Sequence, residues 1–164
     1  MMTVHETLDV IRRVLLAILL IGLVGTTTEL LLLKHDEDFA QFIPLVLIGI
    51  AFVAIAWHEV QRGTASLRLF QITMALFIAA GFLGMYLHYR ANVEFQREVD
   101  PAIAGRALLV KAMTAKTPPA LAPGSMSQLG LIGLAYAYRY PVRRRTDATT
   151  AGAPSRRGRS GENA

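Results

Sequence analysis

The chain has 164 residues, a length typical of a single domain. Hydrophobic residues make up 53% of it, the mean hydropathy is +0.40, and the apolar residues come in blocks long enough to cross a membrane. The absence of cysteine excludes disulfides, thiolate metal sites and cysteine nucleophiles. The net charge of +5 lies beside the apolar blocks and near the C-terminus, so it indicates membrane topology rather than nucleic-acid binding.

The first half of the chain predicts two membrane spans. A polar leader ends in Arg12-Arg13 and runs into an apolar block at 14–33, which at 1.5 Å per residue covers about 30 Å, the thickness of the hydrocarbon. This block is longer than the core of a secretory signal peptide, which favours a retained first span. After a short acidic turn, Asp38 and Gln41 fit a capping box that opens a second span at 39–57.

A third span and a long loop follow. A polar connection at 58–66 separates the second span from an apolar block at 67–87, which predicts the third. Residues 88–119 are predicted to leave the membrane as the longest loop. Within this loop, Asp100 is a suitable N-cap for a helix from Pro101 to about Ala115.

Three prolines, Pro118, Pro119 and Pro123, mark the start of a fourth predicted span at 121–138, which is rich in small residues. The arginine-rich remainder, 143–164, has almost no apolar bulk and is predicted to be disordered. The predicted fold is therefore an all-α integral membrane four-helix bundle at 1–142, with a long, partly helical outer loop and a basic tail.

The distribution of Lys and Arg predicts the orientation. If both termini are cytoplasmic, the inner segments carry eleven of the seventeen Lys and Arg residues and the outer segments carry six. The positive-inside rule therefore favours cytoplasmic termini in a plasma (inner) membrane. Anionic lipid is the expected partner of the arginine-rich tail, and nucleic acid is not.

Small residues recur at one spacing in three of the predicted spans. Because residues three apart share one side of a helix, each pair forms a bare strip that lets neighbouring helices approach closely. Close helix packing is the main interpretation of these strips, and a ligand cleft is the alternative. The six glycines are Gly22, Gly25, Gly81, Gly84, Gly130 and Gly133.

Glu29 lies inside the first predicted span, near its outer end. Because an ionised carboxylate facing lipid is expensive, we expect Glu29 to face the bundle or to take up a proton. A structural hydrogen bond or ion pair is the main interpretation, and a proton-relay or substrate-binding carboxylate is the alternative. The candidate partners of Glu29 are Thr26, Thr28, His88 and Arg90.

No cofactor is predicted, and two histidines leave a minor alternative. His35 and His88 both fall at the predicted outer end, where they could hold a haem or serve a quinone, although neither lies deep in an apolar block. His58, beside Trp57, is interpreted as an interfacial residue. Phosphate-binding loops, nucleophile elbows and zinc-protease motifs are absent from the sequence, so no enzyme activity is predicted.

These observations support three functional hypotheses. The first is a structural or accessory subunit that packs against other membrane subunits or against itself. The second is a small oligomeric transporter coupled to protons or cations through Glu29. In architecture alone, a four-span protein with a carboxylate in its first span is similar to the small multidrug-resistance exporters, but here Glu29 is well off centre and the outer loop is long. The third is a redox protein associated with haem or quinone.

Overall fold

The computed structural model describes residues 3–32, 39–115 and 122–141, and it is helical almost throughout this part of the chain. Helices make up 89% of these residues, which contain no strand, so the predicted all-α class is confirmed. The five helices are α1 (Val4–Leu32), α2 (Phe39–Gln61), α3 (Thr64–Val99), α4 (Gly105–Met113) and α5 (Ala122–Ala137).

Three of the helices, α1, α2 and α3, are long and apolar enough to cross a membrane, which is compatible with an integral membrane protein. The fourth predicted span coincides with α5, which has 16 residues and is shorter than the roughly twenty that a hydrocarbon crossing needs. The predicted four-helix membrane bundle is thus confirmed only as an all-helical fold with three candidate membrane helices.

Helix α1 begins about ten residues earlier than the predicted span, and the polar leader is helical rather than a separate segment. Thr3 and Glu6 explain its start. The Thr3 backbone N–H donates to Glu6 Oε2 at 2.7 Å, and the Glu6 N–H donates to Thr3 Oγ1 at 3.3 Å. This reciprocal pair is a capping box, which satisfies amides that the first turn leaves free.

The predicted polar connection at 58–66 is shorter in the structure, because α2 and α3 both extend into it and leave only Arg62 and Gly63 between them. Arg62 ends α2 in the left-handed region, with φ of +48°, and its N–H donates to the carbonyl of His58 at 2.8 Å. Gly63 then serves as the N-cap of α3 in an extended conformation. The two helices are therefore joined by a very tight turn.

Helix α3 runs on through the first twelve residues of the predicted loop, to Val99. Residues 88–99 contain neither glycine nor proline, so nothing in them interrupts a helix. Asp100 is the C-cap of α3 rather than the N-cap of the next helix, and its Oδ1 accepts the N–H of Ala102 at 3.2 Å. As a result, α4 begins at Gly105 instead of Pro101.

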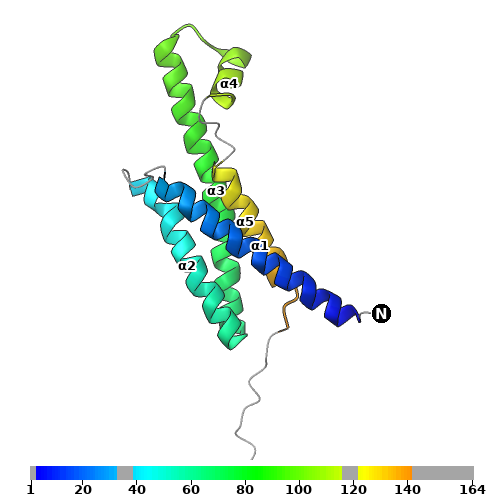
Figure 1. Ribbon diagram of the computed structural model, residues 1–164. Helices are drawn as coiled ribbons and strands as arrows, with labels where there is room; N and C mark the ends of the chain where they lie inside the picture. Colours follow the sequence, from blue (N-terminus) through cyan, green and yellow to red (C-terminus); the bar gives the residue numbers. More distant parts are fainter. Residues whose placement is uncertain (1–2, 33–38, 116–121, 142–164) are drawn as a thin grey trace, which may run out of the picture.

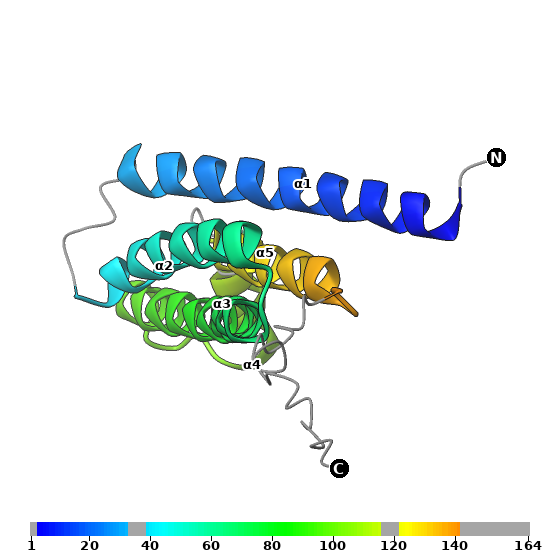
Figure 2. The same ribbon diagram turned by 90° about the horizontal axis from the view of Figure 1, so that it is seen from below.

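The helices are arranged around α3. Helix α5 packs closely along α3, α2 packs against another side of α3, and α4 folds back beside its far end (Figure 1). Helix α1 crosses obliquely over α5 and makes little contact with α2, so it forms a layer of its own above the α2–α5 layer (Figure 2). Among the described helices, α1 is therefore attached mainly through α5.

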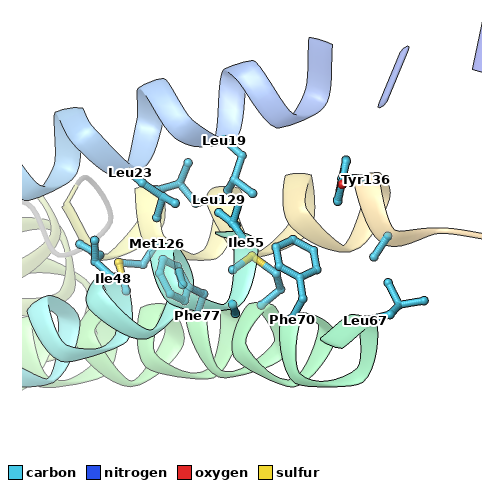
Figure 3. Close-up of a cluster of buried hydrophobic side chains, with 14 of the residues drawn as sticks. Leu19, Leu23, Ile48, Ile55, Leu67, Phe70, Phe77, Met126, Leu129 and Tyr136 are labelled. Carbon is cyan, nitrogen blue, oxygen red and sulfur yellow. The ribbon is translucent and has the colours of Figure 1, made fainter. Parts of the chain in front are cut away.

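The core lies where α1, α2, α3 and α5 meet. The side chains of Phe70 and Phe77 on α3 are fully buried, and Leu129 of α5 belongs to the same buried cluster. Leu19 and Leu23 point from α1 toward this centre (Figure 3). Only Leu30 joins them as a buried residue of α1, so most of the apolar surface of this helix is open.

Most of the predicted packing glycines lie at helix contacts. A Cβ on Gly130 would lie 2.6 Å from the Met74 carbonyl oxygen, and one on Gly81 would lie 2.7 Å from the carbonyl oxygen of Pro123. The other contacts are Gly84 against Pro123, Gly133 against Met74 and Phe70, and Gly22 against Leu129. Gly25 differs, because among the described residues no atom beyond its own chain neighbours and the adjacent helix backbone lies within 4 Å of its Cβ position. The predicted Asp38 cap and the predicted tail at 143–164 lie outside the described residues.

Candidate functional site

Glu29 is exposed on α1. Within the part of the chain that the structure describes, it makes no hydrogen bond or ion pair. The Thr28 hydroxyl donates instead to the carbonyl of Val24 at 2.9 Å, and Thr26 is half-buried. The carboxylate thus lies on the open side of α1, away from the core.

The other predicted polar candidates lie on α3. His88 is half-buried and Arg90 is exposed, and neither is joined to Glu29 by a hydrogen bond or ion pair. His35, the other candidate haem ligand, lies outside the described residues. The structure therefore does not gather the predicted candidates into one site.

A cavity that the sequence did not reveal lies where α1 begins and where α2 and α5 end. Its volume is about 350 Å³. We call it the tyrosine cavity, and it is lined by Asp9, Arg12, Arg13, Leu16, Glu59, Arg62, Tyr136, Tyr140 and Pro141. It is a candidate functional site because three helices bring charged and aromatic groups together around a space.

The buried imidazole of His58 lies against the tyrosines of this cavity. The rings of His58 and Tyr140 meet edge to face with centroids 4.5 Å apart, and Tyr136 lies 6.2 Å away. His58 Nδ1 lies 3.3 Å from Oγ of Ser66, whose hydroxyl also donates to the Gly63 carbonyl at 3.0 Å. Because the Ser66 hydroxyl proton is used in that bond, we assign the proton between the two side chains to His58, whose Nδ1–H donates to Ser66 Oγ. His58 Nε2 then carries the lone pair, and it has no hydrogen-bond partner among the described residues.

Glu59 is held from two sides. The Tyr136 hydroxyl donates to its Oε1, and Arg62 Nη2 donates to its Oε2 at 3.2 Å. The pKa of Arg62 is raised above its ordinary value, first by the nearby phenol of Tyr140 and then by Glu59. Arg62 is therefore a permanent cation, and both oxygens of Glu59 are engaged.

Arg12 ties α1 to the end of α5. Its Nη2 donates to the carbonyl of Arg139 at 3.0 Å, its Nη1 faces Asp9 Oδ1 at 3.4 Å, and its guanidinium lies 5.5 Å from the centre of the Tyr140 ring. Arg139 itself is left-handed, with φ of +48°. The Arg12 side chain is only 16% exposed, so the guanidinium is held in place.

Sequence reasoning missed this site although some of its signals were visible. Tyr136 and Tyr140 stand at the end of the fourth predicted span, where aromatic residues are typical of a membrane interface, and Arg12 and Arg62 count among the Lys and Arg residues that predict topology. His58, predicted to be an interfacial residue, is buried within the protein, with an exposed fraction of 0%. The hydrogen bond between Arg12 and Arg139 spans 127 positions, and no local pattern predicts such a contact.

Comparison of the chain with protein-family models, with curated proteins and with solved structures found no match. Its function is therefore inferred from its own residues.

Proposed function

We propose that the protein is a structural or accessory subunit of a membrane assembly, and that it docks through the exposed side of α1 around Glu29. The observation that carries this proposal is Glu29 itself, exposed on an apolar helix and unpaired within the described residues. A charged residue facing lipid at mid-membrane costs about 3 kcal/mol on insertion scales, and less toward the ends of a span. A hydrogen-bond donor from a neighbouring subunit would remove that cost.

Gly25 is a second feature that suits the exposed side of α1 for docking. Of the two glycines in α1, Gly22 is covered by Leu129 of α5, whereas the Cβ position of Gly25 is open. Gly25 lies one helical turn before Glu29, so the open side of α1 combines a place for close backbone approach with a group that can form a hydrogen bond. In lipid, these two features drive the association of helices.

The proposed assembly lies in the plasma (inner) membrane with both termini cytoplasmic. Helix α5 runs back along α3, so that its chain direction is the same as that of α2 (Figure 1). Together with neighbouring residues, α5 would complete a fourth crossing. The excess of Lys and Arg in the segments then placed inside supports this orientation.

Native mass spectrometry of the protein extracted from its own membrane in a mild detergent tests the docking proposal. The wild-type particle should be heavier than one chain because it retains a second protein or further copies. Glu29→Gln and Gly25→Leu should each reduce this extra mass, since the first weakens the hydrogen bond and the second blocks close approach. Gly49→Leu is the matched control. A Cβ on Gly49 of α2 would also meet nothing within 4 Å among the described residues, but this glycine has no carboxylate beside it.

The composition of the particle separates the functional hypotheses. A foreign protein that is lost in the α1 variants would support an accessory subunit. Copies of this chain alone would instead favour the Glu29-coupled transporter, for which Glu29→Gln should abolish flux in vesicles. A particle of one chain, unchanged by any of these substitutions, would overturn the docking proposal.

A further inference from the structure

We propose that the tyrosine cavity binds an anionic phosphate group, and that the headgroup of a membrane lipid supplies this phosphate. The cavity offers three arginines, Arg12, Arg13 and Arg62, against two carboxylates. Guanidinium groups bind phosphate oxygens through paired, charge-assisted hydrogen bonds, and a volume of about 350 Å³ leaves room for such a group. This inference does not depend on the docking surface of α1.

Both carboxylates of the cavity already contact hydrogen-bond donors of the protein, so the charge that remains for a ligand is positive. Asp9 faces Arg12 at 3.4 Å, and Glu59 accepts from Tyr136 and Arg62. Arg13, by contrast, makes no hydrogen bond or ion pair with any residue that the structure describes, although it lines the cavity. A cationic ligand would have to displace an arginine from its carboxylate, whereas an anion would gain the unpaired guanidinium.

Two of the three arginines are fixed before any ligand arrives. The carbonyl of Arg139 and the ring of Tyr140 hold the Arg12 guanidinium, and Glu59 holds that of Arg62. Fixed donors lose little freedom on binding. The backbone of Arg62 is left-handed, a conformation that glycine adopts at lower cost, so an arginine at this position points to a use for its side chain.

The position of the cavity along α1 favours a lipid as the source of the phosphate. Arg12 and Arg13 line it just before the apolar block begins at Val14, and Leu16 supplies an apolar wall one turn further on. This change from charged to apolar marks the depth of lipid headgroups, where basic pockets between membrane helices bind acidic lipids. The acyl chains of a bound lipid would lie against the open apolar surface of α1.

The test uses the full-length protein in a mild detergent, with lipid retention measured by native mass spectrometry and stability by thermal unfolding. The probes are phosphatidylglycerol, zwitterionic phosphatidylcholine and inorganic phosphate. Wild-type protein should retain phosphatidylglycerol in preference to phosphatidylcholine. Arg62→Gly and Arg13→Gln should each weaken that retention about tenfold, the loss expected for one charge-assisted hydrogen bond.

Two features keep the experiment decisive. Glycine adopts the left-handed backbone conformation of residue 62 at lower cost than arginine does. If Arg62→Gly loses binding while its unfolding temperature is unchanged, misfolding therefore cannot be the cause. Arg68→Gln is the matched control, because this exposed arginine of α3 lies near the same end but does not line the cavity. If inorganic phosphate alone stabilises the wild type but not the two variants, the phosphate site stands and its source is soluble. If no probe distinguishes the wild type from the two variants, the proposal is overturned.

Discussion

A single hydroxyl organises the turn between α2 and α3. Ser66 is 1% exposed, and its Oγ accepts the Gly63 N–H at 3.2 Å, donates to the Gly63 carbonyl and contacts the imidazole of His58. The same side chain therefore stabilises the start of α3 and the ring that supports Tyr140. Because His58 and Ser66 are both buried, water cannot readily replace the contact between them.

We expect Ser66→Ala to lower the free energy of unfolding by about 1–3 kcal/mol, because the buried Nδ1 of His58 and the Gly63 N–H both lose their partner. Thermal unfolding in detergent, followed by circular dichroism, measures the change. Thr64→Ala is the control, since Thr64 is an exposed neighbour at the first position of α3. Equal unfolding temperatures for the two variants would refute the role assigned to Ser66.

The burial of His58 could have been predicted from its spacing. His58 follows the buried residues Ala51, Ala54 and Ile55 at intervals of seven, four and three, which places it on the same face of α2. Its place beside Trp57, at the end of an apolar block, predicts an interfacial residue but says nothing about burial. Which groups surround it could not be predicted, because they come from α3 and α5.

At the scale of helices, the contact between α3 and α5 depends on closely approaching backbones. Gly130 faces the Met74 carbonyl, and the Ser127 hydroxyl donates to the carbonyl of Ile78 at 3.3 Å. Since lipid provides no hydrophobic force between helices, such close packing is a main source of their association.

Gly130→Ala should destabilise the protein by about 1–3 kcal/mol, because its Cβ has no room unless the helices separate. Gly124→Ala is the control on the same helix, where the Cβ position is open. There the substitution should be neutral or stabilise by up to about 1 kcal/mol, because alanine favours helix more than glycine does. Unfolding in detergent compares the two. A Gly130 variant as stable as the Gly124 variant would contradict this view of the contact.

Helix ends were predicted less well than helix faces. The glycine spacing correctly indicates the surfaces by which α3 and α5 meet. The polar residues at 4–13 and 88–99, however, predict a leader and a loop rather than helix. In both segments the chain becomes polar and stays helical. Hydropathy locates the edge of an apolar block, whereas caps such as Thr3 with Glu6 locate the end of a helix.

At the scale of the whole molecule, the all-α class and the three candidate membrane helices follow from the sequence because both depend on long apolar blocks. The order of the helices in space does not, since it depends on contacts between distant residues such as Arg12 and Arg139. The tyrosine cavity depends on that order and so could not be predicted.

The crossing of α3 and the proposed orientation can be tested with single cysteines, because the chain contains none of its own. Gln61→Cys and Arg106→Cys place an exposed thiol near the start of α3 and on α4, beyond its end. In intact cells, a membrane-impermeant maleimide should label the cysteine at position 106 and spare the one at 61. The reverse pattern would invert the orientation, and labelling of both from one side would show that α3 does not cross.

Helix α3 is much longer than a bilayer crossing requires. Its 36 residues span about 54 Å at 1.5 Å each, against about 30 Å of hydrocarbon. The excess carries α4, which lies beside the far end of α3 (Figure 1). The Asn92 Nδ2 of α3 donates to the Ala112 carbonyl of α4 at 3.0 Å and fastens the two helices together. If α3 crosses a bilayer as proposed, this extension holds α4 at a fixed distance from the lipid surface, and a small tilt of α3 becomes a larger sideways displacement of α4.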